Sequence, residues 1–348
     1  MQPSKIIFKN QFPKATSLAQ TPVLIFDKHL LTIPAIKTWL ETFPLKISVT
    51  AGEELKQFSS FEKIFLELLN LVEKTGTKNF TLIGLGGGSV GDFVGFLSSV
   101  FKRGIPLIHI PSTWLSAIDS SHGGKTALNV GGYKNQIGTF YPAQSIYLIK
   151  PILFSQPEER TEEALGEIIK TILLEGNSLW EKTKNWKSLN SQKLWSLLPE
   201  LISYKYKIVK KDPFEKKGIR FFLNFGHTFG HVLESSLKIP HGIAVNYGIR
   251  IALEFSLQKR VITKKRFDDL NKSLLIKNLL FSKESACKVI NEANQFGGIK
   301  KQLLQDKKAA GKNQVNFVFL IAPGKPKVIT IPNEALLKFA ISQEIKEN

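Results

Sequence analysis

The chain has 348 residues, of which 43% are hydrophobic and 22% are charged. This composition is typical of a folded globular protein and excludes disorder, collagen-like repeats and a small disulfide scaffold. Lysine and arginine total 48 against 29 aspartates and glutamates, for a formal net charge of +19. That charge suits nucleic acid, an anionic membrane surface, phosphorylated small molecules, or a lysine-rich surface without a specific partner.

Cysteine content and hydropathy indicate the cellular compartment of the protein. Cys287 is the single cysteine, which excludes an intramolecular disulfide and any paired-cysteine metal or redox motif. No apolar run approaches the ~20 residues needed to span a bilayer, and the first residues do not resemble a secretion signal. The basic residues are spread along the chain without an arginine-rich arm. We therefore expect a cytoplasmic protein without membrane or nucleic-acid partners.

Strand and helix patterns alternate in the first part of the chain. Short apolar runs predict buried strands at residues 23–26, 46–49, 80–85, 107–110 and 145–149. Amphipathic stretches predict helices at 61–73 and 91–101. This alternation is typical of a mostly parallel sheet covered on both faces.

After Pro151 the pattern becomes mainly helical. Helical periodicity covers residues 158–174, 192–210, 227–236, 244–258 and 282–296, while 315–331 reads as a small β-hairpin. With about 100–200 residues per domain, we expect two domains. Residues 1–155 would form a Rossmann-like α/β domain, and residues 156–348 a mainly helical domain.

A glycine-rich turn follows the predicted strand at 80–85. Gly86, Gly88 and Gly91 satisfy the GxGxxG pattern between a strand and a helix. Glycines there let backbone N–H groups and the positive end of a helix approach a pyrophosphate. A purely structural turn is the other reading. The acidic residue expected about 20 positions later for the ribose is absent; Glu53, after another predicted strand, is the substitute.

Two further polar regions attract attention. Residues 111–126 and 129–135 contain small side chains, lysines, an aspartate and an asparagine after a predicted strand. Such side chains suit an anionic, hydroxyl-rich ligand. Asp119, Lys125 and Lys134 could each be ordinary surface residues instead.

Later in the chain, His227 and His231 are four residues apart and so share a helix face. Three histidines and a glutamate in this half resemble a zinc-ligand inventory. Spacing alone favours His227 and His231 as co-ligands, against a structural role for both.

Together these segments resemble the 3-dehydroquinate synthase family of the sugar phosphate cyclase superfamily. The motifs lie in order at residues 86–92, 102–104, 119–126, 134–135, 166–170, 218–231, 241–242 and 306–308. The resemblance implies an α/β N-terminal NAD-binding domain, a mainly α-helical C-terminal metal-binding domain and a homodimer. It also implies a lyase of the shikimate pathway that leads to chorismate and the aromatic amino acids.

The implied reaction converts 3-deoxy-D-arabino-heptulosonate 7-phosphate to 3-dehydroquinate and phosphate. It proceeds by transient oxidation with NAD, phosphate elimination, re-reduction and an intramolecular aldol closure, with one divalent metal, Zn²⁺ or Co²⁺. The metal ligands carried over by motif are Glu167, His227 and His241, which moves His231 from the ligand set to the phosphate pocket.

The resemblance implies roles for other residues as well. The catalytic set is Asp119, Lys170, Lys205 and His231. The substrate contacts are Arg103 from the neighbouring subunit, Lys125, Asn135, Arg220, Asn224 and one of Lys307 and Lys308, with Lys125 and Arg220 on the substrate carboxylate. The NAD contacts are Glu53, Lys56, Gly88, Ser89, Val90, Gly91, Asp92, Ser112, Thr113, Lys125, Lys134, Ile152, Leu153, Phe154 and Ser155.

Three departures from the family pattern are visible. His122 replaces a small or aliphatic residue, Ile243 replaces a common glutamate, and residues 212–218 form a slightly longer stretch, so Lys205 is assigned by its spacing to Asp212. Other sugar phosphate cyclases, acting on sedoheptulose 7-phosphate or glucose 6-phosphate, are the first alternative, and Arg220 favours the carboxylated substrate instead. A metal-dependent alcohol dehydrogenase of the glycerol dehydrogenase type is the second, disfavoured by Glu167 as ligand.

Overall fold

The computed structural model describes residues 4–295, 309–311 and 313–342. It divides into two compact units, Met1–Thr161 and Glu162–Asn348, and each is described by itself. The sequence pattern places the boundary at residue 155, earlier than the structure does. The helix α5 (Lys150–Phe154) buries Ile152 in the core of the first unit. The helix α6 (Glu158–Glu162), which follows it, contains the boundary at Thr161.

The first unit is built on a six-stranded sheet with the order β1-β8-β5-β4-β2-β3, in which all neighbouring strands are parallel. The strands are β1 (Lys5–Lys9), β2 (Pro22–Asp27), β3 (Lys46–Val49), β4 (Thr81–Gly86), β5 (Leu107–Pro111) and β8 (Ser145–Ile149). Five of them were predicted. The strand β1 was missed because it is a partly exposed edge strand with lysine at both ends.

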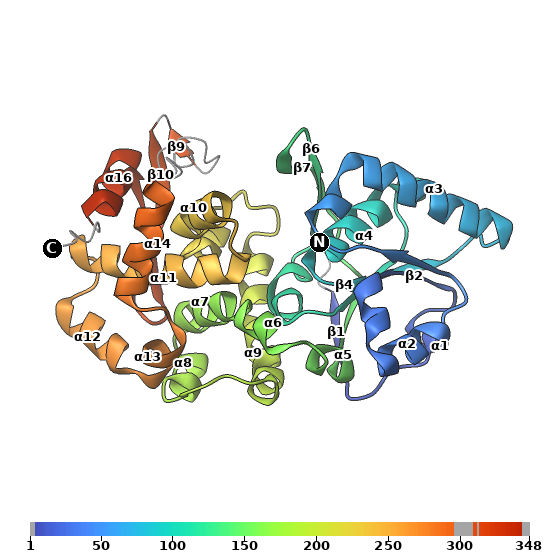
Figure 1. Ribbon diagram of the computed structural model, residues 1–348, viewed down its shortest axis with the longest axis horizontal. Helices are drawn as coiled ribbons and strands as arrows, with labels where there is room; N and C mark the ends of the chain where they lie inside the picture. Colours follow the sequence, from blue (N-terminus) through green and yellow to red (C-terminus); the bar gives the residue numbers. More distant parts are fainter. Residues whose placement is uncertain (1–3, 296–308, 312, 343–348) are drawn as a thin grey trace. The chain divides into compact units, whose positions relative to one another are not determined.

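Helices cover both faces of this sheet, as predicted. Figure 1 shows α1 (Ala15–Leu18) and α2 (Pro34–Glu41) on one side, and α3 (Phe58–Lys74) and α4 (Gly88–Val100) on the other. Alternate strand residues, among them Leu24, Ile83 and Ile108, join the core under α1 and α2. Because side chains alternate along a strand, the residues between them face α4. The strands therefore read as continuous apolar runs.

A two-stranded hairpin, β6 (Lys125–Val130) and β7 (Tyr133–Phe140), follows the sheet strand β5. Its turn holds Gly131 and Gly132, whose φ angles of 57° and 79° lie in the left-handed region that favours glycine. The sequence pattern does not predict this hairpin, because β7 is largely exposed and lacks an apolar face. Figure 1 shows it standing clear of the six-stranded sheet.

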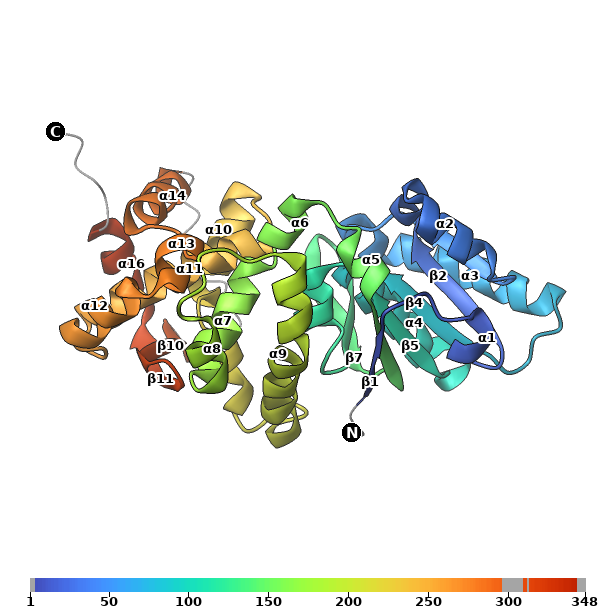
Figure 2. The ribbon, with the colours of Figure 1, turned by 90° about the horizontal axis from the view of Figure 1, so that it is seen from below.

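The second unit is mainly helical, with a small antiparallel sheet. Its helices are α7 (Leu165–Glu175), α8 (Ser178–Thr183), α9 (Ser191–Lys211), α10 (His227–Leu237), α11 (His241–Gln258), α12 (Lys264–Lys272), α13 (Leu274–Leu279), α14 (Lys283–Gln295) and α16 (Asn333–Ser342). The sheet has the order β11-β10-β9 and contains β9 (Ala309–Gly311), β10 (Gln314–Ala322) and β11 (Lys325–Pro332). The strands β10 and β11 pair antiparallel where the hairpin was predicted. Figure 2 shows these elements from below.

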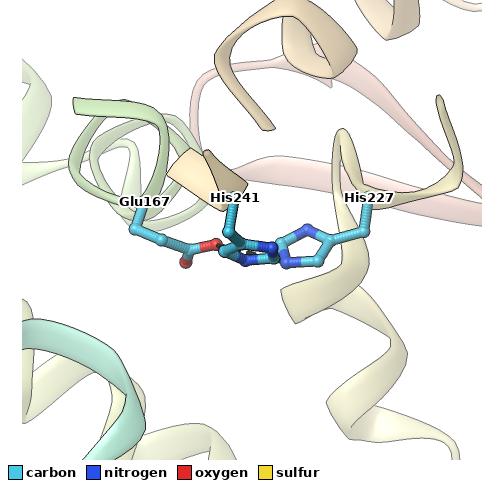
Figure 3. A group of neighbouring side chains, drawn as sticks. All are labelled: Glu167, His227 and His241. Atoms are coloured by element: carbon cyan, nitrogen blue, oxygen red, sulfur yellow. Dashed lines mark ion pairs between the residues drawn. The ribbon is translucent and has the colours of Figure 1, made fainter. Parts of the chain in front are cut away.

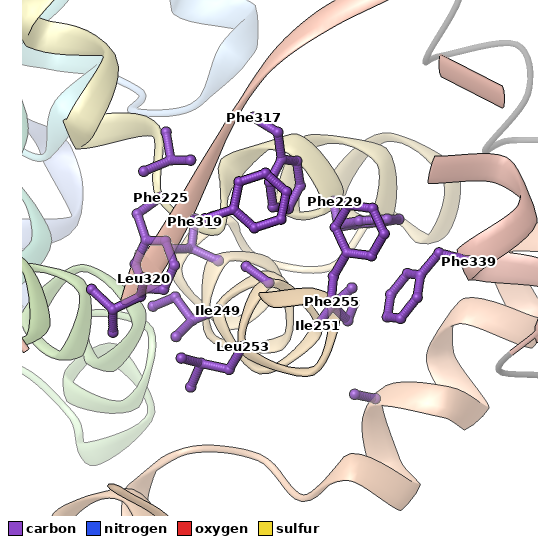
Figure 4. Close-up of a cluster of buried hydrophobic side chains, with 14 of the residues drawn as sticks. Phe225, Phe229, Ile249, Ile251, Leu253, Phe255, Phe317, Phe319, Leu320 and Phe339 are labelled. Carbon is purple, nitrogen blue, oxygen red and sulfur yellow. The ribbon is translucent and has the colours of Figure 1, made fainter. Parts of the chain in front are cut away.

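Aromatic side chains fill the core of this unit around α11 (Figure 4). The ring of Phe255 lies 4.6 Å from that of Phe339 and 5.2 Å from that of Phe317, between ring centres. Burying each such side chain contributes roughly 1.5–3 kcal/mol. Phe229 of α10 joins the same cluster, so the core fixes α10 against α11. Within the described part of the chain, no helix is long and apolar enough to cross a membrane.

Candidate metal and nucleotide sites

Three helices bring one carboxylate and two imidazoles together in the second unit. Glu167 lies in the first turn of α7, while His227 and His241 are the first residues of α10 and α11. Glu167 Oε1 is 3.2 Å from His227 Nε2 and 3.5 Å from His241 Nε2. Their ligand atoms all lie within 4.8 Å of one another, and Figure 3 shows the three side chains converging. This spacing suits one metal ion.

Glycine–backbone contacts set the positions of these ligands. A Cβ atom on Gly166 would stand 2.1 Å from the carbonyl oxygen of Gly242, and one on Gly242 would stand 1.5 Å from that of Glu163. Side chains at these positions would therefore overlap backbone atoms. The backbone of α11 is thus in direct contact with that of α7 and the residues before it. This contact places Glu167 beside His241.

Hydrogen bonds at Nδ1 orient both imidazole rings. His227 Nδ1 donates to the carbonyl oxygen of Phe225 at 3.2 Å, and His241 Nδ1 lies 2.8 Å from Glu234 Oε2. Metal-binding histidines characteristically use the second nitrogen in this way. Nε2 is therefore the atom that each ring directs toward Glu167. Sequence reasoning missed Glu234, although its position seven residues after His227 puts both on one helix face.

Several charged groups surround Glu167. Glu167 is 1% exposed, and one of its carboxylate oxygens forms an ion pair with Lys170 on the same helix. Burial would raise the pKa of Glu167, but Lys170 and His227 outweigh burial and hold that pKa well below its usual range. Burial, reinforced by Lys170, lowers the pKa of His227 to about 4. Burial would also lower the pKa of His241, yet its bonds to Glu167 and Glu234 raise that pKa to about 10.

His231 lies beside this cluster. Its ring centre is 5.2 Å from that of His227 and 6.0 Å from that of His241. Among the described residues, His227 groups with Glu167 and His241, whose ligand atoms all lie within 4.8 Å of one another. This group does not include His231. The geometry therefore does not support the spacing-based pairing of His227 with His231. It brings together the set implied by the family resemblance.

The remaining predicted residues of this unit lie on α9 and the segment after it. Lys205 on α9 is 8% exposed and Arg220 is 6% exposed, so both are buried cations. Arg220 Nε is 3.1 Å from Glu215 Oε1, and its Nη1 donates to the carbonyl oxygen of Pro213. Asn224 ends the 3₁₀ segment η5 (Ile219–Asn224). The predicted contacts Lys307 and Lys308 lie outside the described residues.

The glycine-rich turn of the first unit joins β4 to α4. A Cβ on Gly86 would lie 2.5 Å from that of Val90, so no side chain fits at the start of the turn. The first N–H groups of α4 have no partner within the helix. Gly88 is close to Ser120, and Ser112 and Thr113 follow the neighbouring strand β5. Polar groups thus gather at the carboxyl ends of β4 and β5, where parallel sheets bind nucleotides.

A second cluster joins the 3₁₀ segment η2 (Glu53–Lys56), α4 and the β6–β7 hairpin. Lys56 Nζ is 2.6 Å from Asp92 Oδ2 and donates to Asn135 Oδ1 at 2.5 Å. The Gly52 N–H donates to Ser89 Oγ at 3.0 Å. Burial raises the pKa of Asp92, although the Lys56 ammonium opposes that effect. The structure therefore brings Lys56, Ser89, Asp92 and Asn135 together around the turn, with Glu53 on the same segment as Lys56.

Other predicted residues lie on the segments that follow β5, β8 and α4. Asp119 lies in the π-helical turn η4 (Ser116–Ser120), and Lys125 and Lys134 are exposed on the hairpin. Residues 152–155 follow β8, and the Phe154 ring lies 5.9 Å from that of Trp114. Arg103 is exposed beyond the far end of α4, which at 1.5 Å per residue puts it about 20 Å from the glycine turn of its own chain.

The fold of this chain, a parallel α/β unit followed by a mainly helical unit, is similar to that of solved sugar phosphate cyclases. The solved structure of 2-deoxy-scyllo-inosose synthase with carbaglucose-6-phosphate, NAD⁺ and Co²⁺ matches with a TM-score of 0.77 at 20% identity, covering 97% of this chain and 98% of that one. The 2-epi-5-epi-valiolone synthase of Streptomyces hygroscopicus, with NAD⁺ and Zn²⁺, matches with a TM-score of 0.73 at 17% identity, covering 99% and 97%. The fold-class prediction is confirmed.

Family models narrow this class. The model described as 3-dehydroquinate synthase N-terminal matches residues 46–163, and the C-terminal one matches residues 164–309. The 3-dehydroquinate synthase of Leptospira interrogans is 35% identical over 324 residues, covering 89% of this chain and 84% of the relative. The chain therefore belongs to the 3-dehydroquinate synthase family. It is an enzyme of this kind, a lyase-type sugar phosphate cyclase, as the sequence motifs predicted.

Proposed function

We propose that this chain converts 3-deoxy-D-arabino-heptulosonate 7-phosphate to 3-dehydroquinate and phosphate, using NAD and one divalent metal ion. The observation that carries the proposal is the cluster of Glu167, His227 and His241, with Lys170 in an ion pair with the buried carboxylate. The cluster suits a metal-dependent reaction, and the lysine suits a substrate that carries phosphate. Membership of the family supplies the identity of the substrate.

The residues fit a catalytic metal ion. One carboxylate and two imidazoles make three protein ligands, which leaves positions open for substrate oxygens. Hydrogen bonds at Nδ1 already orient both rings. Glu167 is a buried carboxylate that a divalent cation would neutralise. Zn²⁺ and Co²⁺ both suit mixed nitrogen and oxygen ligands.

The residues around the first unit's turn also fit a dinucleotide. The N–H groups at the start of α4 would face the pyrophosphate, and Ser112 and Thr113 lie at the end of the adjacent strand. The carboxylate of Glu53 would accept hydrogen bonds from the ribose hydroxyls. Support comes from the Gly52 bond to Ser89, which ties the segment that carries Glu53 to the first turn of α4.

When bound, the dinucleotide would accept and return a hydride, and the metal would polarise the oxygen at the oxidised carbon. The chain's own residues would hold the substrate. Lys170, His231 and Asn224 would bind the phosphate, where a lysine lowers the cost of concentrating negative charge. Asp119 and Lys205 would contact the hydroxyls. The leaving phosphate can take the proton itself, so the mechanism needs no separate protein base.

Recognition of the substrate carboxylate distinguishes this reaction from those of other sugar phosphate cyclases. Arg220 can offer two parallel N–H groups to a carboxylate, with Lys125 as a second cation. The ion pair with Glu215 and the hydrogen bond from Nη1 to the carbonyl oxygen of Pro213 hold the guanidinium in place. Sedoheptulose 7-phosphate and glucose 6-phosphate lack this carboxylate and would leave Arg220 without its anion. Arg220 therefore favours the heptulosonate over both.

The proposal also covers assembly and location. A homodimer would supply Arg103 of one subunit to the pocket of the other, which accords with its distance from the glycine turn of its own chain. A single cysteine accords with a cytoplasmic location. The substrate is a small sugar phosphate, and neither nucleic acid nor membrane is proposed as a partner.

A substrate panel tests the function directly. Purified protein with NAD⁺ and Zn²⁺ or Co²⁺ should release phosphate from the heptulosonate phosphate and form dehydroquinate. It should release little from sedoheptulose 7-phosphate or glucose 6-phosphate. An Arg220→Met variant should lose activity chiefly through a higher KM. Phosphate release from one of the other two sugars alone would replace the proposal with a different cyclase activity.

A further inference from the structure

Asn129 forms hydrogen bonds to Glu53 and to Asn135. In the proposed function, Glu53 binds the dinucleotide and Asn135 binds the substrate phosphate. Asn129 lies near the end of β6 and is 3% exposed. Its Nδ2 donates to Glu53 Oε2 at 2.8 Å, and its Oδ1 accepts from the Asn135 N–H at 2.9 Å. One planar carboxamide is thus held at both ends, by a residue far away in the sequence and by one across its own hairpin.

The bond to Glu53 restrains an exposed carboxylate. Glu53 is the first residue of η2 and faces solvent. A glutamate in that position would otherwise sample several rotamers, which costs entropy when a ligand selects one of them. Asn129 Nδ2 holds Oε2 and also lies 3.4 Å from the Glu53 carbonyl oxygen. The other carboxylate oxygen, Oε1, then has a defined direction in which to accept from ribose hydroxyls.

The bond to Asn135 restrains a residue in an uncommon backbone conformation. Asn135 has a φ of 54°, in the left-handed region that residues other than glycine seldom adopt. Its N–H is held by Asn129, and its Oδ1 accepts from Lys56 Nζ. These bonds fix the plane of the Asn135 side-chain amide. The NH₂ of that amide is the group able to donate to a phosphate oxygen.

We propose that Asn129 is a positioning residue that orients Glu53 for the dinucleotide and Asn135 for the substrate phosphate. One side chain therefore sets the affinity for both ligands. The identity of the two ligands rests on the proposed function, whereas the two hydrogen bonds are geometry. A residue that merely braced the hairpin would change stability and leave the affinities of the folded protein unaltered.

Two substitutions at this position separate the two bonds. Asn129→Leu removes both, and each lost bond should weaken its ligand by about tenfold, in the NAD⁺ Kd and in the KM for the heptulosonate phosphate. Asn129→Asp keeps the acceptor for the Asn135 N–H but sets a carboxylate against that of Glu53. It should weaken NAD⁺ by about tenfold and leave the KM within about twofold.

Thr126→Val is the matched control. It removes the hydroxyl contact between Thr126 and Thr139, 2.9 Å long, from the same hairpin, and touches neither Glu53 nor Asn135. Both affinities should stay at the wild-type values. If Asn129→Leu does not fold, the split expected of Asn129→Asp decides the question. NAD⁺ binding is measured by titration of the full chain, and KM from phosphate release at saturating NAD⁺.

Two results would overturn the proposal. One is that both Asn129 variants, folded, keep wild-type values for NAD⁺ and substrate. The other is that Asn129→Asp raises the Kd and the KM equally. Failure of the proposed function looks different, because the wild type would then bind NAD⁺ without releasing phosphate. In that case the NAD⁺ Kd of the same variants, with inorganic phosphate as the second probe, still decides the role of Asn129.

Discussion

His109 makes the stability of the first unit depend on pH. Its ring lies between β5 and α4, where Gly84, Gly91 and Gly95 leave room for it, and it is 6% exposed. Nδ1 has no hydrogen-bond partner among the described residues. Burial alone lowers the pKa of His109 to about 4, so the imidazole is neutral in the folded chain at neutral pH.

The sign and size of the effect follow from linkage. An unfolded histidine has a pKa of about 6.5, so between that value and about 4 the unfolded chain binds a proton that the folded chain does not. The contribution of His109 is thus complete above pH 6.5 and is lost as the pH falls toward 4. A shift of about 2.5 units at 1.36 kcal/mol per unit gives about 3 kcal/mol in full, of which about 2 kcal/mol is lost by pH 5.

Urea unfolding of the full chain at pH 7.5 and pH 5.0 measures this term. His109→Gln should lose about 2 kcal/mol less than the wild type between the two pH values, because it removes the titrating group from the same site. His29→Gln, at an exposed histidine of the same unit, should behave as the wild type does. An equal loss of stability in His109→Gln and the wild type would refute the reasoning.

Three further predictions concern the metal cluster. His241→Ala should lose bound Zn²⁺ while His231→Ala keeps it, as measured by elemental analysis of dialysed protein; equal loss would restore the spacing-based pairing. Glu234→Gln should weaken Zn²⁺ by about ten- to a hundredfold in a competitive chelator titration, since it removes the charged partner of His241 Nδ1; an unchanged affinity would show that this bond does not orient the ring. Gly242→Ala should destabilise the second unit by several kcal/mol in thermal unfolding, because its Cβ would overlap the Glu163 carbonyl oxygen; a wild-type Tm would contradict that close contact.

The pattern of apolar residues was sufficient to predict those strands and helices whose side chains are buried at regular intervals. The strands of the parallel sheet stand out because both faces are covered, which makes them continuous apolar runs. The β6–β7 hairpin escaped prediction for the opposite reason, since β7 is exposed on both sides and carries polar residues. Its strands are set by the turn at Gly131 and Gly132, in a segment whose polarity suggested a ligand site.

The metal cluster could not be predicted from residue spacing within one helix, because its three members lie on different helices and meet through tertiary contacts. Spacing on one helix favoured His227 with His231, whereas His241 starts a different helix and reaches the cluster through the contact at Gly242. The family motif assigned His241 to the metal ligands, which helical periodicity could not do. Glu234 was missed for a related reason, since it acts through His241 and not on the metal itself. Asn129 lies in the polar segment 129–135 that the sequence indicated, but its bond to Glu53, 76 residues away, could not be predicted from that segment.

Two helices, α10 and α11, begin at histidines of the metal cluster. Each helix start carries a partial positive charge of roughly half a unit from its aligned peptide dipoles. Two such ends and Lys170 supply positive charge at a site where the carboxylates of Glu167 and Glu234 supply negative charge. The carboxylates favour a divalent ion, and the charge of the bound ion would add to that of Lys170 and the helix starts in attracting an anionic substrate. Metal and sugar phosphate should therefore bind cooperatively, each raising the affinity for the other.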